Sequence, residues 1–195
     1  MCRRRDVSEP WTDPAGALDA VILAGGRGSR LGGRDKASIE VDGESLLRRA
    51  VDGARSAGCR EVVVVGPPRA GWEEIVQVRE EPAYGGPVAA LAAALGRLRS
   101  EGVLLMAVDL RNAAGVARLL ASLPRPRTGV VLVDGSGADQ WLASRWRTEV
   151  LRGSLTGDHR DQALRRVLGA FEPDRVVVGD DLVRDIDTPA DLEGP

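Results

Sequence analysis

Short apolar runs recur along the chain, and stretches with helical spacing separate them. Five runs of four to seven residues are rich in Val, Leu and Ile, which is typical of buried strands. They cover residues 20–23, 61–65, 102–108, 130–133 and 175–178. Residues 141–146 alternate weakly between apolar and polar side chains, and this pattern favours one further strand.

The helical stretches cover residues 45–57, 88–99, 114–123 and 161–168, with a last helical turn predicted at 191–193. In the first of them the apolar side chains share one face, and Gly58 follows where a helix stop is expected. Strands that alternate with helices predict a single α/β domain. Its sheet is expected to be doubly wound and mostly parallel, with helices on both faces.

The predicted fold also indicates where a ligand would bind. Ligands of such sheets sit beside the carboxyl ends of the strands, so we expect the site in the segments after Leu23, Val65 and Val108. We assign residues 18–195 to the domain. Residues 1–17 are expected to be a flexible tail, because they carry charges and two prolines but no apolar run of a secretory signal.

Composition narrows the class of protein. Hydrophobic residues make up 43% and charged residues 29% of the chain, which is ordinary for a soluble globular protein. A net charge of −2 and an aromatic share of 3% argue against nucleic acid as a partner. The apolar runs are too short to span a membrane. Two distant cysteines, Cys2 and Cys59, fit a reduced, cytoplasmic protein better than a disulfide framework.

The strongest chemical signal is the glycine-rich segment 23–36, which directly follows the first predicted strand. Glycines such as Gly25, Gly26 and Gly28 let the backbone approach phosphates and point N–H groups at them. Arg30 and Lys36 add positive charge for a triphosphate. The segment matches neither the P-loop nor the dinucleotide fingerprint. A flexible loop without function would also be rich in glycine, but the spacing of Arg, Asp and Lys favours phosphate binding.

A second signal is Asp109, a single carboxylate that closes the apolar run 102–108. Mg²⁺ prefers one or two carboxylates together with substrate phosphate oxygens, so Asp109 is a candidate ligand and catalytic residue. The alternative is that Asp109 caps the following helix. Gly66 follows another predicted strand and is expected to line the same crevice.

The segment 23–36 resembles the sugar-nucleotidyltransferase-like superfamily through its Leu-Ala-Gly-Gly, Arg-Leu-Gly and Asp-Lys motifs. Its short Gly-Gly-Arg-Asp-Lys ending is most similar to the molybdenum cofactor guanylyltransferases. This resemblance implies that Leu23, Ala24, Gly25 and Lys36 bind GTP. By the order and spacing of its motifs, the likeness extends from about Leu18 to Leu192.

Two further motifs belong to the same resemblance. Glu80 precedes Gly86-Pro87 at the spacing of the family's acidic residue, which implies that its carboxylate accepts hydrogen bonds from guanine. The alternative is a helix start with its glutamates in solvent. Near the end of the chain, Asp185-Ile-Asp-Thr-Pro is similar to the family's final motif and implies Asp187 as a second metal ligand. The alternative there is a cap for a C-terminal helix, formed by Asp187 or Thr188.

A third region with a family counterpart runs from Asp134-Gly135 to Arg147, and the resemblance implies that it faces the acceptor. Arg145 or Arg147 would then bind the acceptor's phosphate. The alternative is a sheet edge packed by two tryptophans. The chain departs from the family at Arg111, which stands where the family has proline after Asp-x.

The resemblance implies transfer of GMP from GTP to the phosphate of molybdenum-loaded molybdopterin, with Mg²⁺ as cofactor and release of pyrophosphate. Other proteins of cofactor biosynthesis, and acceptor proteins, are candidate partners. Two alternatives stay open. One is cytidylyl or other nucleotidyl transfer to a different phosphorylated acceptor, and the other is a nucleotide-binding protein without catalysis.

Overall fold

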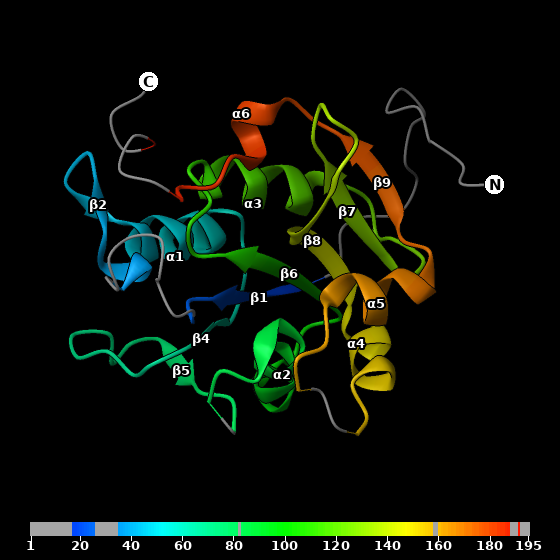
Figure 1. Ribbon diagram of the computed structural model, residues 1–195, viewed down its shortest axis with the longest axis horizontal. Helices are drawn as coiled ribbons and strands as arrows, with labels where there is room; N and C mark the ends of the chain where they lie inside the picture. The colour runs from blue at the N-terminus through cyan, green and yellow to red at the C-terminus, as the bar shows by residue number, and fades with distance from the viewer. Residues whose placement is uncertain (1–16, 26–34, 82, 158–159, 188–190, 192–195) are drawn as a thin grey trace.

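The computed structural model describes residues 17–25, 35–81, 83–157, 160–187 and 191, and within these ranges a seven-stranded sheet forms the centre of the molecule (Figure 1). The strands lie in the order β5 (Val76–Val78), β4 (Val62–Val65), β1 (Leu18–Leu23), β6 (Gly102–Ala107), β8 (Asp139–Arg147), β7 (Gly129–Val133) and β9 (Asp174–Val177). Among these strands only β8 runs antiparallel to its neighbours. The predicted mostly parallel α/β sheet is confirmed. Apart from Ala17, the predicted tail lies outside the described residues.

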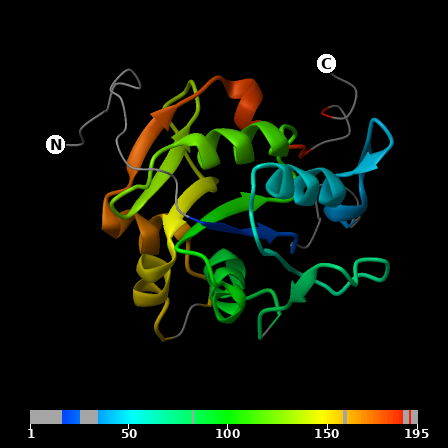
Figure 2. The ribbon, with the colours of Figure 1, turned by 180° about the vertical axis from the view of Figure 1, so that it is seen from behind.

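Helices cover both faces of the sheet, as predicted, and Figure 2 shows the two layers from behind. One layer holds α1 (Leu46–Ser56), α3 (Ala113–Ser122) and α6 (Asp180–Val183). The other holds α2 (Gly86–Ala94), α4 (Thr148–Ser154) and α5 (Leu164–Leu168). In β1, Ala20 and Ile22 pack towards the first layer and Val21 towards the second, so every residue of the strand is buried. This explains the continuous apolar run of the sequence.

The ends of α1 follow from local sequence chemistry. A small hairpin, β2 (Glu40–Val41) and β3 (Glu44–Ser45), precedes the helix, and its Asp42-Gly43 turn has positive φ at both residues. The Ser45 side chain then accepts a hydrogen bond of 3.2 Å from the backbone N–H of Arg48 and caps the helix. Gly58 follows the helix with φ of 88°, as predicted for a helix stop.

All four predicted helices differ from their predicted bounds, α1 only by one residue at each end. The stretch predicted at 88–99 begins earlier, at Gly86, and its α-helical part ends at Ala94, where the 3-10 turn η3 (Leu95–Arg97) replaces the last turns. The helix predicted at 161–168 begins only at Leu164, because Asp161 has a left-handed backbone with φ of 54°. The helix predicted at 114–123 begins one residue early, and Asn112 caps it by accepting from Gly115 N–H at 2.9 Å.

The segment predicted at 141–146 forms β8, which is longer than expected and lies inside the sheet between β6 and β7. The interpretation of this segment as a sheet edge is therefore wrong. Its two tryptophans do pack as expected: the rings of Trp141 and Trp146 are stacked with centroids 6.4 Å apart. The sequence pattern did not predict β5, the β2–β3 hairpin, α4, α6 or the short 3-10 helices η2 (Lys36–Ser38) and η4 (Gly169–Phe171).

Candidate functional site

The carboxyl ends of β1, β4 and β6 meet at one edge of the sheet, and the residues that follow these strands lie against one another. The N–H of Ala24 donates to Val65 O at 2.8 Å, and the N–H of Val108 donates to Leu23 O at 3.1 Å. Gly66 lies against Ala24 so closely that a Cβ atom there would stand 2.9 Å from its carbonyl oxygen. Gly66 therefore lies against the start of the glycine-rich segment, and this close approach requires glycine.

Three predicted residues from distant segments meet at this edge. The Lys36 ammonium lies 2.6 Å from a carboxylate oxygen of Asp109 and 2.6 Å from one of Asp187. Partial burial favours a lower pKa for Lys36, but the hydrogen bonds and charges of the two aspartates outweigh it and raise the pKa. Lys36 ends the glycine-rich segment that follows β1, Asp109 follows β6, and Asp187 lies near the C-terminus. The fold therefore brings the three together, as the motifs implied.

The same geometry tests whether a metal fits. A single cation, the Lys36 ammonium, reaches oxygens of both Asp109 and Asp187, so the two carboxylates are able to share a divalent ion. In the part of the chain that the structure describes, no cluster of three His, Cys, Asp or Glu side chains forms a metal cage. Two carboxylates with open positions suit Mg²⁺ that also binds phosphate oxygens. Asn112, and not Asp109, caps α3, so the capping interpretation of Asp109 is wrong.

Asp185 adds a third carboxylate that the sequence reasoning did not single out. Asp185 and Asp187 belong to the same segment and flank the fully buried Ile186 in the sequence. Desolvation and the negative charges of Asp109 and Asp187 raise the pKa of Asp185 to about 6. The motif Asp-Ile-Asp was the available signal, because two aspartates flanking a buried residue point to the same side.

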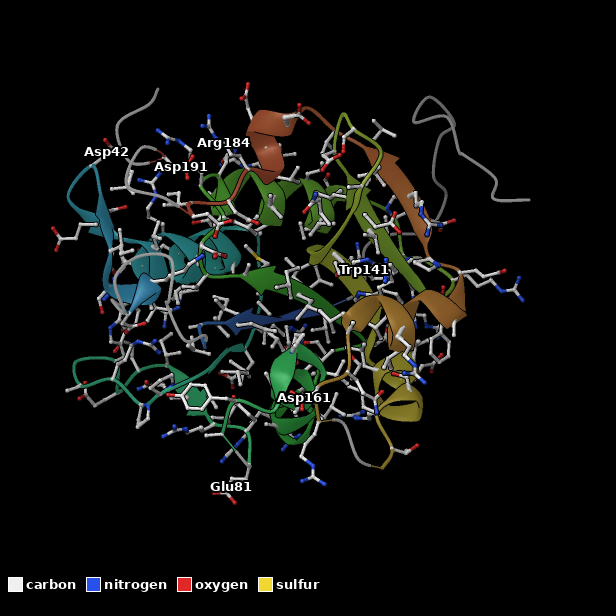
Figure 3. All side chains as sticks on the ribbon, viewed as in Figure 1. Asp42, Glu81, Trp141, Asp161, Arg184 and Asp191 are labelled. Atoms are coloured by element: carbon white, nitrogen blue, oxygen red, sulfur yellow. The ribbon has the colours of Figure 1, made fainter. Side chains whose placement is uncertain are left out.

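The C-terminal segment is held at this edge by backbone pairing. Leu110 forms an isolated bridge with Asp185, and the N–H of Ile186 donates to Asp109 O at 2.9 Å. The N–H of Arg111 donates to Arg184 O at 2.9 Å, which the family's proline could not do. Arg184 and Asp191 form an ion pair of 3.3 Å and lie side by side in Figure 3. The departure at Arg111 therefore adds a contact that positions the aspartates.

A second group of residues anchors the glycine-rich segment. The Arg69 guanidinium donates to both carboxylate oxygens of Asp35, at 2.9 and 2.8 Å, and to Ala24 O at 3.0 Å and Pro67 O at 2.9 Å. Partial burial favours a higher pKa for Asp35, but the hydrogen bonds and the positive charge of Arg69 outweigh this effect and lower the pKa. Arg69 thus ties the start of the segment to its end. Of the predicted residues in between, Gly26, Gly28 and Arg30 lie outside the described residues, whereas Gly25 is described.

Glu80 is buried, with 8% of its surface exposed, and its Oε1 accepts a hydrogen bond of 2.9 Å from Tyr84 N–H. The interpretation that places this glutamate in solvent is wrong, although it fits Glu81, which points away from the molecule in Figure 3. The expected helix start is present as well, with Pro87 in the first turn of α2. The two glutamates of this motif therefore differ in burial, and guanine recognition by Glu80 stays a prediction.

The predicted acceptor contacts of Arg145 and Arg147 are wrong. Because β8 is antiparallel to β6, Arg147 pairs with Gly102 at the amino edge of the sheet, the edge opposite to Asp109. Arg145 is 1% exposed and donates to Leu120 O and Leu123 O at the end of α3. The part of this region at the site edge is the start of β8.

At that start, Asp139 receives a two-pronged ion pair from Arg175, at 2.7 and 2.9 Å. Next to it, the Gln140 amide donates to the Asp134 carboxylate at 2.6 Å. These contacts fix the turn between β7 and β8, which contains Asp134 and Gly135. This turn stays the candidate acceptor region, whereas the two arginines do not.

Comparisons with known proteins find guanylyltransferases among those similar to this chain. A probable molybdenum cofactor guanylyltransferase from Opitutus terrae is 38% identical over 101 residues, which are 49% of this chain and 50% of that protein. The molybdenum cofactor guanylyltransferase of Shewanella sediminis is 28% identical over 146 residues, 71% of this chain and 72% of that protein. The match thus spans only half the length of the first relative.

A solved structure shows the same fold. A nucleotidyl transferase from Methanothermobacter thermautotroptrophicus superimposes with a TM-score of 0.71 at 23% identity, covering 90% of this chain and 94% of that one. No helix among the described residues is long and apolar enough to cross a bilayer. The family model described as a MobA-like NTP transferase domain matches residues 20–176, and the chain therefore belongs to that nucleotidyltransferase family.

Proposed function

We propose that this protein transfers GMP from GTP to the phosphate of molybdenum-loaded molybdopterin, with Mg²⁺ as cofactor. The observation that carries the proposal is the meeting of Lys36, Asp109 and Asp187 at the carboxyl edge of the sheet. The names of the two guanylyltransferase relatives support the choice of nucleotide and acceptor. The product is the guanine dinucleotide form of the cofactor, and pyrophosphate leaves.

The reaction needs no protein nucleophile. An oxygen of the acceptor phosphate attacks the α-phosphorus of GTP, and the bond to the oxygen that bridges to the β-phosphate breaks. The electron pair leaves with pyrophosphate. The protein's task is to align the two anionic substrates and neutralise charge. We expect the triphosphate to bind beside Leu23, Ala24 and Gly25, with the Lys36 ammonium as its cation, and Gly66 packs against Ala24 at the same place.

Asp109 and Asp187 are the residues that would hold Mg²⁺. A bound Mg²⁺ supplies charge neutralisation to the phosphate oxygens. The Lys36 ammonium now sits between the two carboxylates, so metal binding leaves it available to the triphosphate. Arg30 is proposed as a second cation for the triphosphate. This exchange would explain why the Lys36 ammonium lies 2.6 Å from an oxygen of each aspartate that would hold the metal.

The base would be recognised by Glu80. Its Oε1 is held by Tyr84 N–H, which orients the carboxylate before the nucleotide arrives. Guanine offers N1–H and its 2-amino group as two neighbouring donors, whereas cytosine offers one amino group. The acceptor would bind near the fixed turn at Asp134. A cytoplasmic location, and contacts with other proteins of cofactor biosynthesis, complete the proposal.

The test is a pyrophosphate-release assay with four nucleoside triphosphates, each with molybdenum-loaded molybdopterin, inositol 1-phosphate or a sugar 1-phosphate. We expect release only with GTP, the pterin and Mg²⁺, and none after chelation by EDTA. Turnover with CTP in place of GTP would favour the cytidylyl alternative. GTP binding without pyrophosphate release, for every acceptor tried, would favour a binding protein without catalysis.

A further inference from the structure

A second charged feature lies at the amino edge of the sheet, away from the site described above. A hollow of about 220 Å³ opens there, and its charged walls are formed by Arg99, Arg125, Arg147 and Arg152 with Glu101 and Glu149. A smaller cavity of about 10 Å³ adjoins it and shares Glu101, Arg125 and Arg147 with it. The smaller cavity is also lined by the buried Arg145, so the two cavities together are lined by five arginines.

Charge at this hollow departs from that of the whole chain. The chain carries a net charge of −2, but the four arginines and two glutamates of the hollow leave an excess of two positive charges, and Arg145 in the smaller cavity adds a third. An anion would therefore be drawn to this edge by the local field and not by the protein's overall charge. The hollow is also far from the site: Gly102 starts β6 here and Asp109 follows its end, about 20 Å away at ~3.3 Å per strand residue.

The arginines are held in place before any ligand binds. Arg125 pairs with Glu101 at 2.8 Å, and Arg147 pairs with Glu149 at 2.7 Å. The Arg152 guanidinium donates to Leu98 O at 2.9 Å. Each guanidinium has five N–H donors, so these contacts fix the group and leave further donors for a ligand. A binding site built from fixed side chains loses little conformational entropy when it binds.

Two donors at this hollow lack a partner. Among the described residues, the buried side-chain nitrogen and oxygen atoms without a hydrogen bond are the Nε atoms of Arg145 and Arg147, and both residues line the smaller cavity. Arg145 is 1% exposed, and burying a cation without an anionic partner is costly. Its Nη1 satisfies carbonyls of α3, whereas its Nε lies 3.7 Å from the point where a Cβ on Gly102 would stand.

The buried carboxylate of Asp19 does not supply the missing partner. Asp19 accepts hydrogen bonds from the N–H groups of Glu61, Arg99 and Ser100 and from the Ser100 hydroxyl, at 2.6 to 3.3 Å. Its oxygens are thus taken up by the backbone. The positive charge of Arg145 faces the smaller cavity without a carboxylate bonded to it.

We infer that this hollow binds a phosphate-sized oxyanion, either as a free ion or as the phosphate group of a small molecule. The guanidinium groups of Arg147 and Arg152 offer the planar, paired donors that suit phosphate oxygens, and the larger cavity has room for the whole group. A water or an oxygen of the ligand in the smaller cavity would satisfy the Nε donors. This site does not depend on the proposed transferase reaction.

The experiment is a calorimetric titration of the full-length protein with inorganic phosphate, at constant ionic strength set with chloride. All proteins carry Lys36→Ala, which weakens phosphate binding at the carboxyl edge. We expect one phosphate per chain. In this background Arg147→Gln and Arg152→Gln should each weaken binding about tenfold or more, since each removes a charge-assisted contact. The matched control is Arg118→Gln, an exposed arginine of α3 outside the hollow, which should leave the affinity unchanged.

Two results would overturn the inference. One is the absence of phosphate binding in the Lys36→Ala protein, and the other is equal affinity in the Arg147→Gln and Arg118→Gln variants. The Nε–H resonance of Arg145 gives a second readout, because phosphate should shift it in ¹H–¹⁵N spectra, and an unmoved resonance also contradicts the site. Titration with 5′-GMP separates the sources. Affinity equal to that of phosphate identifies a phosphorylated molecule as the ligand, and weaker binding identifies the free ion.

Discussion

At the carboxyl edge of the sheet the carboxylates of Asp109 and Asp187 flank one ammonium group and Asp185 feels the charge of both, whereas at the amino edge five arginines face two glutamates. The first edge has an excess of negative charge and suits a cation. The second has an excess of positive charge and suits an anion. Because the sheet separates them, the two fields do not cancel, and each edge keeps its own ligand chemistry.

The edges also differ in how the chain builds them. Asp109 lies 73 residues and Asp187 lies 151 residues after Lys36 in the chain. The three meet because the parallel strands have their carboxyl ends at one edge of the sheet. The amino edge draws on the antiparallel strand β8, whose end carries Arg145 and Arg147 away from the first site. One reversed strand thus determines which arginines face which ligand.

The largest expected effect is at the carboxyl edge. Asp109→Asn should lower turnover by about 10²–10³-fold, because one of two carboxylates able to hold the metal is neutralised. The free energy of unfolding should change little, since the side chain is only partly buried. Steady-state pyrophosphate release and urea unfolding measure the two quantities. Asp181→Asn, which changes an exposed carboxylate of α6, is the control. Near-normal turnover of Asp109→Asn with Mg²⁺ would contradict the site.

The next effect concerns stability at the amino edge. Arg145→Ala should lower the free energy of unfolding by about 3 kcal/mol, because two carbonyls at the end of α3 lose their donor and the buried stem is removed. Arg127→Ala, an exposed arginine nearby, should stay within about 0.5 kcal/mol of the unmodified protein. Urea unfolding measures both. Equal stability of the two variants would show that Arg145 is not needed to hold α3.

A smaller effect is expected at the Arg69 contact between the two ends of the glycine-rich segment. Arg69→Gln removes the two-pronged pair with Asp35 and the contact with Ala24 O, so the segment is less well positioned for the triphosphate. The KM for GTP should rise about tenfold, while kcat changes less. Arg55→Gln, on the exposed surface of α1, controls for the lost charge. A KM like that of the control would mean that Arg69 serves only the fold.

The same comparison shows what the sequence predicts well. Asp109 and Gly66 follow buried apolar strands, and in a parallel sheet the position after a strand is also a position in space. Periodicity therefore indicated correctly that these two residues lie at one edge of the sheet, whereas Lys36 was found from its motif. The direction of a strand has no such signature. The pattern of apolar and polar side chains in β8 does not indicate whether the strand runs parallel or antiparallel to its neighbours. Arg145 and Arg147 were therefore assigned to the wrong edge of the sheet.

Residues that act through distant partners were also missed. Arg69 stands in a Gly-Pro-Pro loop and meets Asp35, which is 34 residues away, so no local spacing reveals the pair. Asp185 appears in the final motif, but its crowding against Asp109 depends on the bridge between Leu110 and the C-terminal segment. Side-chain patterns report burial and local structure, whereas these contacts depend on tertiary packing.

The smallest expected effect tests how tightly the amino edge is closed around Cys59. Burial and the charge of Asp19 raise the pKa of the Cys59 thiol to about 12, from an ordinary value of 9.0. Well below pH 9 the thiol is neutral in both the folded and the unfolded chain, so it contributes no pH dependence there. Between pH 9 and 12 the unfolded chain releases the proton and the folded chain does not. Stability should therefore fall as the pH rises above 9, and Cys59→Ala should make this fall shallower.

In a Cys2→Ser protein, where Cys59 is the remaining cysteine, maleimide at pH 8 should label the thiol only after unfolding in urea, as mass spectrometry would measure. Rapid labelling of the folded protein would mean that the edge opens readily, and the buried cation of Arg145 beside it would then be open to water as well.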